Sequence, residues 1–159
     1  MSTTFATTPP ATQRYFDALD KASDRMTVIR IGQSEEGRDM IVGIIADEAT
    51  IKSLDKYKAI TAQLTDPRTI TEAQARQLIA TGKPIYWATG NLHSGETDSA
   101  EMQMELAFRL IVEETPFIQT IRNNVITMLT PVVEVDGREK VVDNLYYRKK
   151  TGRSIPLVY

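Results

Sequence analysis

The chain has 159 residues, of which 42% are hydrophobic and 25% charged, and this composition is typical of one ordinary globular domain with a sizeable core. Its formal net charge of −2 comes from interspersed acidic and basic residues, so we expect no nucleic-acid partner and no membrane-binding surface. The absence of cysteine excludes disulfides and thiolate metal sites but leaves the cellular compartment open. No apolar run approaches the length that spans a bilayer. A small or neutral molecule is therefore the expected partner.

The amino-terminal part of the chain predicts a tail, a helix and a pair of strands. Residues 1–11 are rich in Thr, Ala and Pro, which predicts a disordered lead-in before a folded unit over residues 12–159. Apolar residues recur at helical spacing over 12–22. Residues 26–31 and 40–46 have strand composition, and the segment between them is typical of a hairpin connection. We expect these two strands to pair antiparallel.

Two further helices are predicted before the middle of the chain. The first covers about 51–64 and ends at Asp66-Pro67. For the second, the spacing of Thr69 and Glu72 predicts a capping box, and Gly82 can close the helix.

The central stretch predicts a strand, a crossover helix and a second strand. Residues 85–89 form a short apolar and aromatic run, and Gly90-Asn91 then takes the chain out of the sheet in a turn. A helix is expected over about 99–114. The nearly continuous apolar run 125–133 suits a strand buried on both faces. The predicted fold class is α/β, with a mixed sheet flanked by helices, in which the antiparallel pair is followed by a parallel, right-handed βαβ unit.

The crossover helix carries its own expectations. Asp98 and Glu101 have the spacing of an N-terminal cap. Met102, Leu106 and Leu110 lie on one stripe, so we expect these side chains in the core.

His93 and Glu96 lie in the turn after the 85–89 strand, and His93 is the only histidine of the chain. Open α/β sheets bind ligands at the carboxyl ends of their strands. An imidazole nitrogen and a carboxylate oxygen are a zinc-type ligand pair, so the two residues are candidate metal ligands. The alternative is a surface histidine that makes ordinary hydrogen bonds. A catalytic zinc takes three protein ligands, and no second histidine exists to complete the set.

Four motifs occur in an order that resembles the M14-type zinc carboxypeptidases. They are Ile31-Gly-Gln-Ser-Glu-Glu-Gly-Arg38, Gly90-Asn-Leu-His-Ser-Gly-Glu96, Pro131-Val-Val-Glu-Val-Asp-Gly137 and Tyr147-Arg-Lys149. Each motif alone is weak, but together they make the chain similar to the amino-terminal half of the family's catalytic domain, from about Tyr15 to Tyr159.

The resemblance implies a zinc-dependent hydrolase that cleaves peptides at a carboxyl terminus. His93 and Glu96 would be the first two ligands of one Zn²⁺ ion. Arg148 would polarise the scissile carbonyl and stabilise the oxyanion, because a guanidinium supplies positive charge where negative charge develops; without the resemblance it is a solvated residue of a basic cluster. In the family, a third ligand, a glutamate base and a carboxylate-binding Asn-Arg pair follow, which here would lie beyond Tyr159.

Two residues depart from the family pattern. Many members have an arginine where this chain has Gly95, and the family's Asn-Pro-Asp-Gly is here Glu134-Val-Asp-Gly. Asp136 and Gly137 keep residues typical of a turn. A cell-wall peptide or an N-acyl amino acid is therefore an alternative substrate. A non-catalytic binding module with the same fold is a further alternative.

The resemblance also predicts that the fold is incomplete and that the chain alone is inactive. An unpaired strand edge and an apolar sheet face would then be exposed, and self-association is expected.

Overall fold

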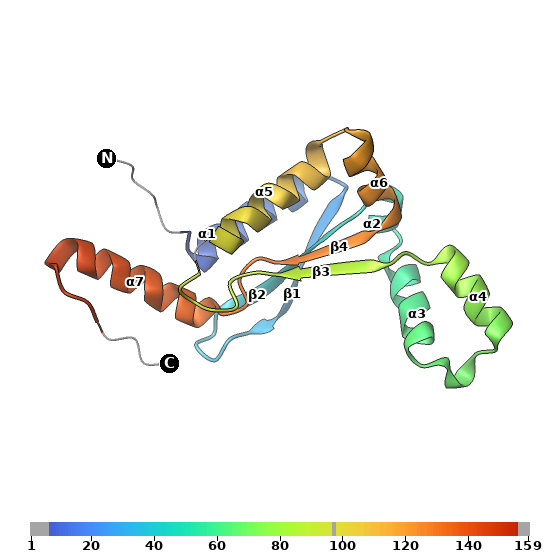
Figure 1. Ribbon diagram of the computed structural model, residues 1–159, viewed down its shortest axis with the longest axis horizontal. Helices are drawn as coiled ribbons and strands as arrows, with labels where there is room; N and C mark the ends of the chain where they lie inside the picture. The colour runs from blue at the N-terminus through green and yellow to red at the C-terminus, as the bar shows by residue number, and fades with distance from the viewer. Residues whose placement is uncertain (1–6, 97, 156–159) are drawn as a thin grey trace.

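The computed structural model describes residues 7–96 and 98–155 (Figure 1). The predicted lead-in falls mostly on residues 1–6, which lie outside the described residues. In chain order the elements are α1 (Pro9–Ala22), β1 (Met26–Gln33), β2 (Asp39–Ile45), α2 (Glu48–Ile51), α3 (Leu54–Thr65), the 3-10 helix η1 (Pro67–Thr69), α4 (Glu72–Thr81), β3 (Ile85–Thr89), α5 (Asp98–Val112), α6 (Pro116–Asn124), β4 (Ile126–Thr130) and α7 (Val135–Thr151).

The strands of the described residues form one mixed sheet in the order β1-β2-β4-β3. β1 pairs antiparallel with β2, and β2 pairs antiparallel with β4. β3 and β4 run parallel, from Ile85 opposite Ile126 to Thr89 opposite Thr130, with α5 and α6 between them in the chain. This confirms the predicted antiparallel pair followed by a parallel βαβ unit.

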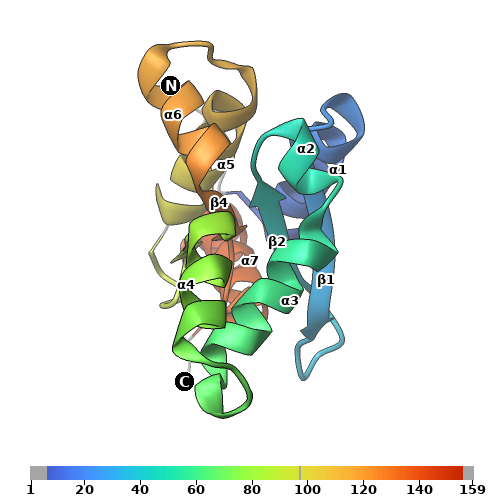
Figure 2. The same ribbon diagram turned by 90° about the vertical axis from the view of Figure 1, so that its right-hand side faces the viewer.

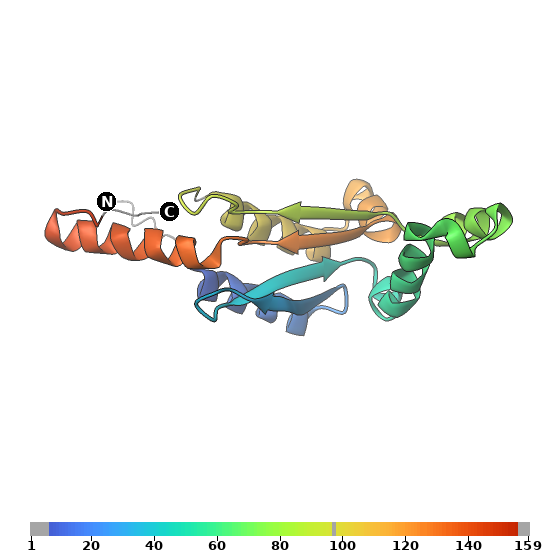
Figure 3. The same ribbon diagram turned by 90° about the horizontal axis from the view of Figure 1, so that it is seen from below.

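One face of the sheet carries the main core, and α1 and α5 cover it (Figure 3). Phe16 of α1, Ile45 of β2 and Leu129 of β4 are at most 1% exposed, and Leu110 of α5 packs with them. The helices contribute one apolar stripe each and the strands contribute every second side chain. These two sets of apolar side chains pack against each other in a single core layer.

The opposite face is largely open. Ile29, Ile85 and Trp87 are 42%, 45% and 54% exposed. α3 covers this face near one end only, where Tyr57 helps to line an apolar groove with Ile29. α3 and α4 project together beyond the amino end of β3 (Figure 1), and both lie in front of the sheet in the view of Figure 2. None of the helices in the described ranges has the length and hydropathy of a membrane span.

The helix starts differ from the sequence expectation at two places. α1 begins at Pro9 rather than residue 12, because Thr8 caps it and proline suits the first helical turn. α4 is capped by Thr71, whose capping box uses Gln74, and not by Thr69 with Glu72. Thr69 instead belongs to η1.

The predicted core stripe of α5 is wrong at Met102, which is 52% exposed. The helix is rotated so that Gln103, Ala107 and Leu110 are buried. Small residues such as Ala107 allow close packing on the sheet. Asp98 is the first helical residue of α5.

The region after β4 was also predicted incompletely. The predicted strand 125–133 is too long: β4 ends at Thr130 because Pro131 has no N–H for the ladder. Asp136 and Gly137 lie in the first turn of α7 and not in an isolated turn. Polar and apolar residues are mixed around this helix, so it has no clear apolar stripe. The sequence pattern therefore did not predict a helix here.

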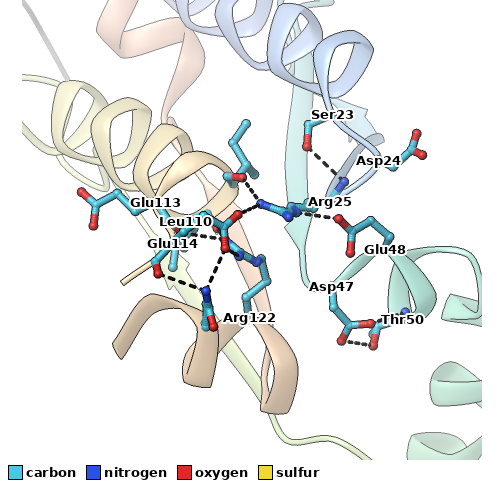
Figure 4. Close-up of polar contacts among 12 residues, drawn as sticks. Ser23, Asp24, Arg25, Asp47, Glu48, Thr50, Leu110, Glu113, Glu114 and Arg122 are labelled. Carbon is cyan, nitrogen blue, oxygen red and sulfur yellow. Dashed lines mark hydrogen bonds and ion pairs between the residues drawn. The ribbon is translucent and has the colours of Figure 1, made fainter. Parts of the chain in front are cut away.

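A polar cluster fixes the end of the sheet where β3 and β4 begin (Figure 4). Arg122 is 4% exposed and donates to the carbonyl oxygens of Leu110 and Glu113, both at 2.9 Å. Glu114 accepts from Arg122 at 2.8 Å and from Arg25 at 2.5 Å. The two guanidinium groups thus satisfy the free carbonyls at the carboxyl end of α5, where positive charge is favourable.

Candidate metal centre

The chain leaves the sheet at the carboxyl end of β3 through Gly90. The Gly90 N–H donates to the Thr130 carbonyl oxygen at 2.8 Å, which extends the contact between β3 and β4 by one residue. A Cβ at position 90 would lie 2.8 Å from the Gln103 amide nitrogen and 2.9 Å from the Pro131 carbonyl oxygen. No larger residue fits that space without movement of the backbone, so glycine is needed where the loop begins.

Asn91 shapes the loop that follows. Its backbone is left-handed, with φ of 52°, and the residue is 1% exposed. The Asn91 Nδ2 donates to the carbonyl oxygens of His93, at 3.3 Å, and of Glu96. Its N–H donates to Ser99 Oγ at 2.7 Å. The Glu96 N–H closes a tight turn by donating to the His93 carbonyl oxygen at 2.9 Å. One buried amide therefore holds both ends of the turn.

The two predicted ligands converge in this turn. His93 Nδ1 lies 3.0 Å from Glu96 Oε1, and their side chains are 75% and 59% exposed. Two ligands that share one tetrahedral zinc ion at about 2.0–2.2 Å lie about 3.4 Å apart. The observed 3.0 Å is the length of a direct hydrogen bond, so the two atoms would have to move apart by roughly 0.4 Å to share an ion.

The described residues provide two candidate ligands for such an ion. Within residues 7–96 and 98–155, no third His, Cys, Asp or Glu joins His93 and Glu96 in a group able to hold a metal. A catalytic zinc site uses three protein ligands.

An open pocket of about 390 Å³ lies beside His93 and is lined by Leu92, His93, Ser94, Gly95 and Glu134. The Gly137 N–H donates to Glu134 Oε1 at 3.0 Å, so this carboxylate caps α7. A Cβ at Gly95 would meet no atom within 4 Å. Packing does not require glycine there, and the pocket has room for a larger group.

Arg148 lies apart from these residues. It is exposed in the last turn of α7, which runs away from the His93 loop (Figure 1). At about 1.5 Å per residue, Arg148 is about 20 Å along the helix from Glu134 at the pocket. The structure brings His93 and Glu96 together but does not bring Arg148 to them, so a role for Arg148 stays a prediction.

The chain matches the family model described as Zinc carboxypeptidase over residues 12–154. It is similar in structure to carboxypeptidase A from Helicoverpa armigera, at 18% identity and a TM-score of 0.60, with 86% of this chain and 26% of that chain covered. A metallo-carboxypeptidase from Burkholderia cenocepacia is similar at 16% identity and a TM-score of 0.56, with 82% of this chain and 28% of that chain covered. Bovine thrombin-activatable fibrinolysis inhibitor, solved in complex with tick carboxypeptidase inhibitor, is similar at 14% identity and a TM-score of 0.55, with 94% of this chain and 36% of that chain covered.

The chain thus spans about a quarter to a third of the length of these solved structures. No curated protein sequence matches it. The structural likeness concerns the fold, whereas the family model covers nearly the whole chain. The chain therefore belongs to the M14 family of zinc carboxypeptidases.

Proposed function

We propose that this chain carries the first two zinc ligands, His93 and Glu96, of a peptide hydrolase that acts at a carboxyl terminus. The observation that supports the proposal is the 3.0 Å separation of His93 Nδ1 and Glu96 Oε1 in the loop after β3. Zinc in such a site lowers the pKa of a bound water and polarises the carbonyl that is attacked. His93 and Glu96 would hold the ion, and Asn91 fixes the turn that presents both side chains.

Arg148 is proposed to stabilise the negative charge that develops on the scissile carbonyl. This role requires the second half of α7 to change its path. The buried residues of α7 are Val135, Gly137, Arg138 and Val142, so its second half buries no side chain among the described residues. Little packing therefore fixes Arg148 where it lies, and a rearrangement of this segment costs few buried contacts.

The second candidate function concerns the substrate. Gly95 leaves open space in the His93 pocket, where an arginine would bind the terminal carboxylate of an ordinary peptide. This favours a zinc amidohydrolase that acts on a cell-wall peptide or an N-acyl amino acid. A binding module without catalysis is the remaining alternative, and zinc binding at His93 would distinguish it from both enzymes.

We also propose that the 159-residue chain associates with itself through β3, one of the two edge strands of the described sheet. Pro84 and Gly90 direct their backbone groups to β4, so the alternate residues Ile85, Trp87 and Thr89 direct theirs to the open edge. Light scattering should detect oligomers that Trp87→Lys disperses. A wild-type chain that stays monomeric at high concentration would contradict this proposal.

The main proposal is tested by a zinc titration paired with hydrolysis of a blocked dipeptide. Because the chain has a single histidine, its imidazole gives one NMR signal that reports zinc at His93. We expect binding weaker than about 1 µM and no turnover, since two ligands lose much of the chelate advantage and no base is positioned. The His93→Ala and Glu96→Ala variants should lose the binding. A wild-type signal unchanged by zinc would remove the metal proposal, and submicromolar affinity would show a third ligand within the chain.

A further inference from the structure

The connection between β1 and β2 contacts the first turn of α7 through Asp136. Asp136 accepts hydrogen bonds from Ser34 Oγ at 2.7 Å, from the Glu36 N–H at 3.1 Å and from Arg38 Nη1 at 2.6 Å. The side chain of Asp136 is 14% exposed. Two segments about 100 positions apart in the sequence are thus joined by one carboxylate.

Further charges support this contact. Glu36 pairs with Arg38 at 2.5 Å and also with Lys140, which lies one turn along α7 from Asp136. Burial by itself raises the pKa of Asp136, but hydrogen bonds from Ser34 and Arg38 outweigh burial and leave the pKa below its ordinary value. Asp136 is therefore ionised at neutral pH, and its bonds to Arg38 are charge-assisted.

The same turn of α7 contacts the loop that holds the proposed ligands. A Cβ at Gly137 would lie 2.0 Å from Ser94 Oγ, so the helix backbone approaches the residue next to His93. Ser94 is 4% exposed. On the other side of the turn, the Glu134 N–H donates to the Asn91 carbonyl oxygen at 3.2 Å. The first turn of α7 thus touches the loop on both sides of His93.

We propose that Asp136 and Arg38 are positioning residues for the metal pair. They hold the first turn of α7 against Asn91 and Ser94. The contact with α7 then fixes the loop and, with it, the spacing of His93 and Glu96. Among the described residues, neither Asp136 nor Arg38 makes a hydrogen bond or ion pair with His93 or Glu96, so any effect on the pair passes through α7. The inference rests on the proposed zinc site for its metal readout, but its geometric part does not need the metal.

The first experiment uses the metal-free chain. Asp136→Ala and the milder Asp136→Asn should accelerate hydrogen exchange of the Glu96 amide, whose N–H bonds to the His93 carbonyl oxygen. We expect exchange about tenfold faster in Asp136→Ala at a temperature where the protein stays folded. The control is Asp47→Asn, which removes a charge from an ion pair with Lys83 outside this contact. It should leave Glu96 exchange unchanged after correction for global stability.

The second experiment titrates zinc against the His93 NMR signal of the same variants. Arg38→Ala and Asp136→Ala should bind zinc about 3–10-fold more weakly than wild type. This is less than the roughly 10–100-fold effect of removing a direct partner of a metal ligand, because both residues act through α7. Arg38→Lys keeps the charge and should recover part of the affinity. Folded variants with wild-type Glu96 exchange and zinc affinity would overturn the inference. If zinc leaves the wild-type His93 signal unchanged, the proposed function fails, and the exchange measurement alone decides the positioning role.

Discussion

The two ends of the sheet use polar groups in opposite ways. Where β3 and β4 begin, Arg122 is 4% exposed and bonds to two carbonyls and a carboxylate. Where the strands end, His93 and Glu96 are mostly exposed, and the buried Oδ1 of Asn91 has no partner among the described residues. At the first end the hydrogen-bonding groups of Arg122 are satisfied. At the second end Asn91 has an unsatisfied oxygen, and His93 and Glu96 are exposed and accessible to a ligand.

The difference indicates how the protein separates stability from chemistry. A buried polar group adds stability when all its bonds are made, whereas a group that must take up a ligand has to leave bonds unmade. We therefore expect substitutions at the first end to change folding and those at the second end to change metal binding.

The largest effect should come from Arg122→Met. The methionine keeps an apolar stem but leaves the carbonyls of Leu110 and Glu113 buried without a donor. Such losses destabilise by about 3 kcal/mol, which denaturant unfolding would measure. Arg68→Met is the control, because Arg68 is 85% exposed and pairs only at the surface; it should cost about 0.5 kcal/mol or less. Similar losses of unfolding free energy in both variants would contradict the structural role of the Arg122 hydrogen bonds.

The next effect concerns Asp47, which pairs with Lys83 and Thr50. Burial raises the pKa of Asp47, but hydrogen bonds from Lys83 and Thr50 outweigh it and lower the pKa to about 2 from 3.8. A depressed folded pKa contributes stability above the unfolded pKa, and this is lost as the pH falls from about 4 toward 2. Asp47→Asn should cost about 2 kcal/mol at pH 7. The variant should also flatten the pH dependence of unfolding between pH 4 and 2, and an unchanged curve would refute the assignment.

A smaller stability loss is expected for Asn91→Ala. The variant loses the bonds to His93 and Glu96 and places alanine at positive φ, but it also removes an oxygen without a partner. The net cost should be about 1.5 kcal/mol. Zinc affinity should fall in the same variant. Asn91→Gly tolerates the backbone conformation and isolates the loss of the side-chain bonds; if it binds zinc like wild type, the amide does not position the ligands.

The smallest change in folding should follow His93→Ala. The imidazole is exposed and, within the part of the chain that the structure describes, pairs only with Glu96, so the free energy of unfolding should change by about 0.5 kcal/mol or less. Metal binding should be lost in the same sample. Unfolding measured with and without zinc checks both statements, because a ligand stabilises only the state that binds it. A large destabilisation without metal would place His93 among the structural residues.

The sequence predicted the sheet well because its signals are local. The run 85–89, the break at Gly90-Asn91 and the apolar run 125–133 each follow from short-range patterns, although the last strand ends earlier, at Thr130. The convergence of His93 and Glu96 was also accessible, since a tight turn brings two side chains three positions apart to one point.

What the sequence left undetermined depends on distant contacts. The buried face of α5 is chosen by its contact with α1 and the sheet, so Met102 was misplaced. The first turn of α7 is held in place by Asp136 and its partners near residue 36. Asn91 could be recognised as a turn residue, because asparagine tolerates positive φ. The hydrogen bonds of its side-chain amide could not be predicted, because they form only in the folded loop.

The solvent-exposed second half of α7 has a consequence for proteolysis. Arg148, Lys149 and Lys150 form consecutive trypsin sites on an exposed helical turn. Cleavage requires local unfolding, and this turn gives up no buried side chain when it opens. Arg122 and Arg138, which are 4% and 0% exposed, are protected until the fold itself opens. Trypsin should therefore cut the end of α7 well before it cuts at Arg122 or Arg138.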